Sequence, residues 1–158
     1  MPKITPSLWF DTKALEAAEF YVSVFPNSKV NNVSYYGEAG PRPAGTVLTV
    51  DFELDGQAYT ALNGGPEFTF DEAVSFRINC ADQDEVDHYW SRLTADGGAE
   101  SQCGWLKDKY GLSWQVVPAA LQELMTDPDA GRAQRAMEAM LKMQKIDVAA
   151  LRAAADSA

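Results

Sequence analysis

Cys103 is the side chain of this sequence best suited to nucleophilic or acid–base chemistry. A thiol reacts through its thiolate, so it needs a nearby positive charge, which Lys107 or Arg77 could supply. The alternative is that Cys103 is a small buried residue of a polar-to-aromatic strand. Cys80, at a strand-to-helix junction, is interpreted as structural. Because no basic start followed by an apolar stretch opens the chain, we expect both thiols to be free.

His88 is the one histidine of the sequence, and a single imidazole limits the metal sites and catalytic sites that one chain can form. A site that needs two or more imidazoles from one subunit is excluded. His88 falls in the middle of a predicted helix, where we interpret it as a half-buried core residue rather than a catalytic base.

Four further side chains are candidates for binding a small molecule. Trp9 and Trp105 could form flat aromatic walls, or they could fill the core or a dimer interface. Asn63 precedes Gly64-Gly65, so it could donate a hydrogen bond to a ligand or simply form a turn. Arg77 could pair with a carboxylate, or it could extend to solvent.

An internal repeat with an offset of 68 residues must position these side chains. Ser7–Asp11 corresponds to Ser75–Asn79, and Phe20–Val22 corresponds to His88–Trp90 without a gap. Each copy is an alternating strand followed by an amphipathic helix, and three strand-like runs follow each helix. These runs are Val30–Tyr36, Thr46–Leu54 and Gln57–Leu62 in the first copy, and Ala99–Cys103, Gly104–Leu106 and Leu112–Val117 in the second.

The two copies therefore predict an α+β fold of paired βαβββ modules, at about residues 4–63 and 73–118. Asp55-Gly56 is a strong signal for a two-residue hairpin turn. Residues 119–158 form a helical extension, with helices expected at Ala119–Met125, Ala130–Lys145 and Asp147–Ala155. Such an extension cannot stand alone in water, so it must pack on the domain or on a partner subunit.

Strand alternation predicts which side chains share a face. Successive residues of a strand point to opposite sides, so Leu8 and Phe10 should face their helix while Trp9 faces away. The same rule divides the second module. Phe76, Ile78, Trp114 and Val116 should face the helices, and Ser75, Arg77, Asn79, Ser113 and Gln115 the opposite side.

The composition excludes some functions. Thirteen basic and 23 acidic residues give a net charge of −10, which repels nucleic acid, although one basic residue in a pocket could attract a small anion. No apolar run approaches the ~20 residues that span a bilayer. We therefore expect a cytoplasmic protein without nucleic-acid or membrane partners.

Several motifs resemble a known superfamily. Leu8–Asp11, Ala17–Tyr21 and Phe25 resemble the opening strand and helix of vicinal-oxygen-chelate (glyoxalase/bleomycin-resistance/dioxygenase) proteins. Further motifs resemble the PhnB-like subfamily. They are Ala61–Pro66, Ser75-Phe76, Asp82–Asp87, Cys103–Asp108, Gly111–Pro118 and Met143–Leu151.

The resemblance implies that the paired modules form a curved, mixed eight-stranded sheet, and that the protein is a homodimer. Proteins of this subfamily often carry the name 3-demethylubiquinone-9 3-methyltransferase. This sequence has no Gly-rich strand-to-helix turn of the kind that binds adenosyl cofactors, so we do not expect methyl transfer.

The resemblance also defines where metal ligands would lie. Metal-dependent members hold one divalent ion with His, Glu or Gln side chains on four strands. The corresponding positions fall near Thr5, Ala61 or Asn63, Ala73 or Ser75, and Gln115. Only Gln115 could be a ligand, and one neutral donor cannot compensate for dehydrating a divalent cation. We expect neither metal nor cofactor.

Two functions follow as hypotheses. The first is a metal-free protein that binds a small, partly aromatic molecule through Trp9, Asn63, Arg77, Trp105 and Gln115. The second is a metal-independent enzyme that acts on a small carbonyl or aromatic substrate through Cys103. A weaker third hypothesis is a dimeric interaction module that uses the C-terminal helices.

Overall fold

The computed structural model describes residues 2–157 and divides the chain after Phe70 into two compact units. Eight strands and five α-helices form within the described residues, and the strands lie in two four-stranded sheets. The predicted α+β class with βαβββ modules and C-terminal helices is confirmed. No helix among the described residues is long and apolar enough to cross a membrane.

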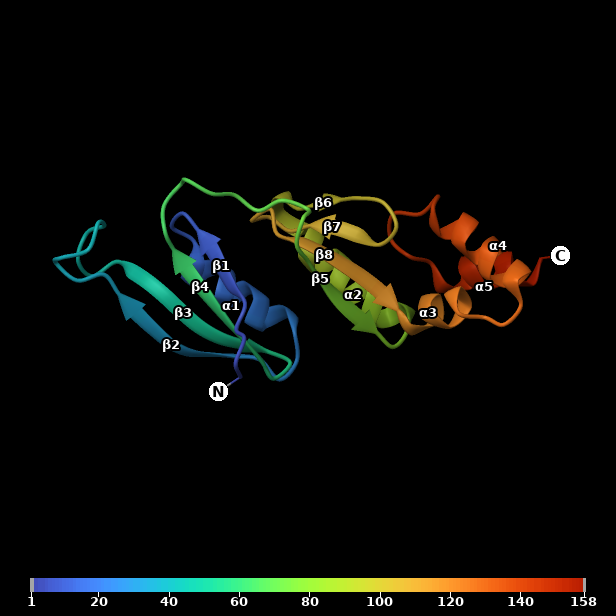
Figure 1. Ribbon diagram of the computed structural model, residues 1–158, viewed down its shortest axis with the longest axis horizontal. Coiled ribbons are helices and arrows are strands. Elements are labelled where there is room, and N and C mark those ends of the chain that lie inside the picture. Colours follow the sequence, from blue (N-terminus) through green and yellow to red (C-terminus); the bar gives the residue numbers. More distant parts are fainter. Residues whose placement is uncertain (1, 158) are drawn as a thin grey trace. The chain divides into compact units, whose positions relative to one another are not determined.

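The first unit is one βαβββ module. It contains β1 (Ser7–Phe10), α1 (Ala14–Val24), β2 (Lys29–Tyr35), β3 (Val47–Leu54) and β4 (Gln57–Asn63). The strand order is β1-β4-β3-β2, with β1 and β4 parallel and the other pairs antiparallel. Figure 1 shows α1 running along this sheet, and Tyr21 of α1 and Phe52 of β3 are fully buried between them.

The second unit repeats this order and then continues. It contains β5 (Ser75–Cys80), α2 (Gln83–Thr94), a short 3-10 turn (Ala95–Gly97), β6 (Ala99–Glu100), β7 (Trp105–Lys107) and β8 (Ser113–Pro118). The strand order β5-β8-β7-β6 matches that of the first sheet, and β5 and β8 are parallel. Helices α3 (Ala119–Met125), α4 (Ala130–Met140) and α5 (Val148–Asp156) follow.

Local sequence signals explain several boundaries. Asp55 and Gly56 both have positive φ (50° and 80°), as the predicted β3–β4 hairpin turn requires. Asp82 caps α2 by accepting from the Glu85 amide, and Glu85 accepts in return from the Ala81 amide. Asp147 caps α5, as the sequence predicts.

Two expected elements are wrong in extent, and both lie at one junction. The helix expected at Ala130–Lys145 ends at Met140, and the strand expected at Ala99–Cys103 ends at Glu100. Both elements end early because the Gln102–Gly104 turn and the segment after Met140 pair with each other through their backbones. The Cys103 amide donates to the Met143 carbonyl and the Gly104 amide donates to the Gln144 carbonyl, both at 2.8 Å. In a helix through Lys145 these carbonyls would point along the helix axis, so the non-helical backbone lets them face the turn instead.

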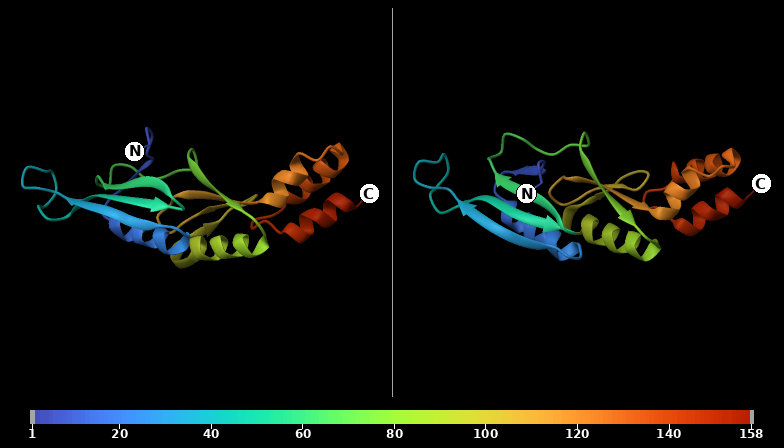
Figure 2. Two further views of the ribbon diagram at one scale, coloured as in Figure 1. Left: turned by 90° about the horizontal axis from the view of Figure 1, so that it is seen from below. Right: turned by 60° about the horizontal axis from the view of Figure 1, so that its bottom comes forward.

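This junction attaches the C-terminal helices to the second unit. Ile146 is completely buried and belongs to a small core with Leu121, Leu124, Ala136 and Leu151. Two side chains of α2, Gln83 and Asp87, complete the attachment. Gln83 donates to the Ile146 carbonyl at 3.0 Å and accepts from the Val148 amide at 2.7 Å, and Lys145 pairs with Asp87 at 2.8 Å. Figure 2 shows α4 and α5 lying side by side beyond β8 and α3.

We predict that Gly104→Ala weakens this attachment more than an equivalent change elsewhere. Gly104 has φ +83°, and an added Cβ would lie 2.9 Å from the Val116 carbonyl oxygen and 3.2 Å from Ile146. Strain and overpacking together should lower the free energy of unfolding by about 3 kcal/mol. Gly111 is the matched control, since its φ is +87° and nothing lies within 4 Å of its Cβ position. Gly111→Ala should cost about 1 kcal/mol. Urea unfolding measures the free energy of unfolding of both variants. Equal losses would show that the close approach of position 104 to Val116 and Ile146 is unimportant.

Candidate functional site

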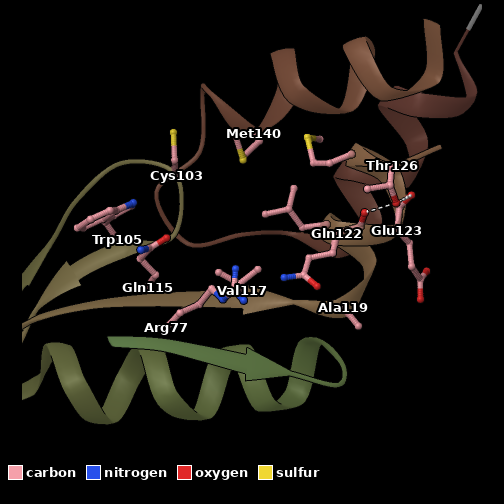
Figure 3. A pocket seen from close by; sticks show the side chains of 12 residues that line it. Arg77, Cys103, Trp105, Gln115, Val117, Ala119, Gln122, Glu123, Thr126 and Met140 are labelled. Atoms are coloured by element: carbon pink, nitrogen blue, oxygen red, sulfur yellow. Dashed lines mark hydrogen bonds between the residues drawn. The ribbon is translucent and has the colours of Figure 1, made fainter. Parts of the chain in front are cut away.

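A cavity of about 710 Å³ lies in the second unit, between the sheet and the C-terminal helices. Residues of β5, β7 and β8 form one wall, and residues of α3 and α4 form the other. Its lining residues are Arg77, Cys103, Trp105, Gln115, Val117, Ala119, Leu121, Gln122, Glu123, Met125, Thr126 and Met140. Figure 3 shows Met140 on α4 facing the strands that carry Gln115 and Val117.

The strand wall follows from the register of the sheet. Arg77 on β5 is paired with Gln115 on β8, and Gln115 is paired with Trp105 on β7. These three side chains therefore form a row across the face of the sheet that α2 leaves open, while Ile78, Leu106 and Val116 are buried on the other face. The predicted division of the second module into two faces is confirmed.

Gln115 is held in a fixed orientation. Its Nε2 donates to the Ser75 hydroxyl oxygen at 2.9 Å, which leaves the amide oxygen of Gln115 available to accept a hydrogen bond. Arg77 is exposed, and its side chain takes part in none of the ion pairs or hydrogen bonds found among residues 2–157. The cavity thus contains an unpaired guanidinium beside an oriented amide.

Cys103 lies at the cavity in a turn, not in the expected strand. Its φ is +59°, because the Gln102–Gly104 turn has to present consecutive amides to the C-terminal segment. Lys107, one of the two cations expected to activate it, forms an ion pair with Glu72 at 2.8 Å. This lysine holds the pKa of the Glu72 carboxyl below its usual value, chiefly through its hydrogen bond.

The two site candidates of the first unit have structural partners. The Nε1 of Trp9 donates to the Gly65 carbonyl at 2.9 Å, and its ring meets Phe68 edge-on at 4.9 Å. Asn63 faces α1 rather than the open face: its Oδ1 accepts from the Ala14 amide and its Nδ2 donates to the Val47 carbonyl. Asn63 caps α1 in this way, so its amide is not directed at a ligand.

His88 is exposed on α2, with its ring edge-on to Tyr89 at 4.9 Å, so the interpretation as a half-buried core residue is wrong. The repeat aligned it with Phe20, but the solvent-facing side of an amphipathic helix tolerates either residue. Cys80 is buried, as a structural cysteine should be, and burial raises the pKa of its thiol to about 12.

The residues at the positions where the resemblance would place metal ligands do not fit a divalent ion. Ala61 and Asn63 face α1, and Ser75 and Gln115 are hydrogen-bonded to each other and offer only neutral oxygens. Among residues 2–157 no three His, Cys, Asp or Glu side chains come together as a metal site would need. A divalent cation prefers several charged or imidazole ligands, and this donor set provides none.

Sequence reasoning missed the helical wall of the cavity and one buried hydroxyl. Ser113 is fully buried on β8, and its Oγ finds no hydrogen-bond partner within residues 2–157. It lines a second, smaller pocket of about 180 Å³ together with Lys107 and Glu72. Alternation places Ser113 on the open face, but nothing in the sequence indicates that it would be covered.

Comparisons with known proteins agree with this architecture. A family model described as 3-demethylubiquinone-9 3-methyltransferase matches residues 2–117. A PhnB protein from Bacillus cereus, named for the same methyltransferase, is 37% identical; the match covers 75% of this chain and 100% of that one, with a TM-score of 0.68. A comparison with curated proteins found no match.

More distant structures share the fold. Protein PA1353 from Pseudomonas aeruginosa is 19% identical over 75% of this chain and 98% of its own, with a TM-score of 0.60. The fosfomycin resistance protein FosX from Listeria monocytogenes is 13% identical over 78% and 97%, with a TM-score of 0.52. These two likenesses show a shared fold. This chain belongs to the PhnB-like family described as 3-demethylubiquinone-9 3-methyltransferase.

We predict that the two thiols differ sharply in reactivity. At pH 8 a thiol reagent such as dithionitrobenzoate should modify Cys103 in the native protein and leave Cys80 untouched, because Cys80 is buried and its pKa is about 12. Cys103→Ser should abolish the native reaction, whereas Cys80→Ser should leave it unchanged. Modification of Cys80 before unfolding would contradict this assignment.

We also predict that Ser113→Ala does not destabilise the protein. Removing a buried hydroxyl without a partner relieves a desolvation cost, so the free energy of unfolding should rise by about 1 kcal/mol. Ser91→Ala on the exposed side of α2 is the control and should have little effect. A loss of more than about 1 kcal/mol for Ser113→Ala would show that the hydroxyl has a partner.

Proposed function

We propose that the protein binds a small organic molecule, without a resident metal, in the cavity of the second unit. The observation that carries the proposal is the composition of this cavity. Trp105, Val117, Leu121, Met125 and Met140 give it apolar walls, and a few polar groups interrupt them. An apolar cavity with few polar groups is the usual form of a small-molecule site.

The cavity is also large enough for this role. Its volume of about 710 Å³ lies within the range of roughly 300–1,000 Å³ typical of small-molecule sites. Trp105 offers an aromatic edge or face to a planar ligand, and methionine side chains adapt their shape to different ligands. The binding role assigned to Arg77, Trp105 and Gln115 from the sequence is part of this proposal. Trp9 and Asn63 are not, because the groups described above hold them in place.

Metal independence is part of the same proposal, and the donor set supports it. A serine hydroxyl and a glutamine amide that bind each other leave no anionic ligand for a cation. The family description names a methyltransferase, but the chain has no Gly-rich turn for an adenosyl cofactor. We therefore do not extend methyl transfer to this chain.

Blocking the cavity tests the binding proposal. Indole, quinoline and 2-naphthol serve as planar probes, with binding measured by calorimetry before and after dialysis against EDTA. At least one probe should bind saturably, and EDTA should not change its affinity. Val117→Phe fills the cavity and should abolish binding, whereas Ser91→Phe on the exposed side of α2 should not. Binding that survives Val117→Phe, or that needs a metal, would contradict the proposal.

A second candidate is a metal-independent enzyme that uses Cys103, because this thiol lies at the same cavity. It requires Cys103 to react with iodoacetamide near neutral pH faster than free cysteine does. Mass spectrometry of the modified peptide measures the rate. A rate no higher than that of free cysteine rejects this candidate.

We also propose that the chain is a homodimer and cytoplasmic, as the sequence predicts. The support for a dimer is family membership and the edge strands, since β1 and β5 each pair with one strand only within their sheets. Sedimentation equilibrium should give twice the chain mass of 17.3 kDa, and a monomer at micromolar concentration would contradict it.

A further inference from the structure

We infer that the ligand class of this cavity is a small carboxylate with a flat apolar body, oriented by Arg77. The inference rests on the proposed function and names the chemistry of the ligand. It starts from the charge of Arg77, whose guanidinium lines the cavity and has no ionic or hydrogen-bond partner among residues 2–157.

An unpaired arginine is notable in this chain because acidic residues outnumber basic ones by 23 to 13. Carboxylates are therefore abundant, and other cations use them: Lys107 pairs with Glu72, and Lys145 pairs with Asp87. Arg77 projects instead from the open face of the sheet, where its neighbours across the strands are the neutral Gln115 and the indole of Trp105. The position leaves the five donors of its guanidinium for a ligand.

The single carboxylate of the lining does not neutralise Arg77. Glu123 lies on α3, and its Oε2 is 3.8 Å from the guanidinium of Arg152. Figure 3 shows Glu123 extending away from the strands, on the side of the cavity remote from Trp105. The strand side of the cavity therefore has positive charge, and an anion placed there meets no fixed carboxylate.

The geometry around Arg77 defines the rest of the ligand. A guanidinium binds a carboxylate through two parallel hydrogen bonds, which fixes the direction of the ligand. Trp105, one pairing position beyond Gln115, then offers its indole to a planar body, and Val117 and Met140 close around apolar atoms. The free amide oxygen of Gln115 can accept from a hydroxyl or amine on the same ligand.

A matched pair of probes tests the ligand class. 2-Naphthoate and 2-naphthamide share a ring system and differ in the charge of the head group. The wild-type protein should bind the naphthoate about ten-fold more tightly or better, because a charge-assisted pair in a partly enclosed site exceeds a neutral hydrogen bond. Arg77→Gln should remove this difference while leaving naphthamide binding unchanged. Arg77→Lys should restore part of it, since the charge remains and the bidentate geometry is lost.

Arg92→Gln is the control. It removes the same charge from α2, the helix that lies on the opposite face of this sheet. It should keep the full preference for naphthoate. Equal affinities of the wild type for both probes, or a preference that survives Arg77→Gln, would overturn the ligand class while the proposed binding function stands. If neither probe binds while indole, quinoline or 2-naphthol does, the ligand class falls and the proposed function stands. If none of the five binds, both fall.

Discussion

The backbone pairing between the Gln102–Gly104 turn and the segment after α4 is the constraint on which the second unit depends. Two amides of the turn donate to two carbonyls of Met143 and Gln144, and Ile146 is then completely buried beside Gly104. A Cβ atom at position 104 would lie too close to the Val116 carbonyl oxygen and to the Ile146 side chain. Cys103 and Gly104 both adopt positive φ in this turn. The turn places Cys103 at the cavity.

The same contact determines what the open face of the second sheet becomes. Without α3 and α4, the row of Arg77, Gln115 and Trp105 would be an ordinary solvated strand face. With the helices attached, Leu121, Met125 and Met140 stand opposite the strands and enclose a volume. On the strand wall of this cavity, Ser75 and Gln115 are hydrogen-bonded to each other.

Much of the fold and the strand wall of the site could be predicted from the sequence, for a definite physical reason. A strand has a period of two residues, so the apolar positions Ile78 and Val116 determine where Arg77 and Gln115 must point. The turn at Asp55-Gly56 and the cap at Asp147 form as predicted, because both depend on local contacts. Membership of the family follows from motifs in order along the chain.

The remaining features depend on contacts that are distant in sequence. Residues Leu141–Lys145 continue a helical pattern, but the Met143 and Gln144 carbonyls accept hydrogen bonds from a turn about forty residues earlier, so tertiary pairing overrides local propensity. Asn63 looks like a turn residue or a donor, and only the position of α1 reveals that it caps a helix. Ser113 and the helical wall of the cavity could not be predicted, since both depend on where the extension packs.

A crystal structure of the protein soaked with 2-naphthoate tests the central claim most directly. Density for the ring should lie between Trp105 and Met140, the carboxylate should lie within hydrogen-bond distance of the Arg77 guanidinium, and no metal should be present at Ser75 and Gln115. A metal at those positions, or a cavity filled by protein side chains with the ligand bound elsewhere, would contradict the account.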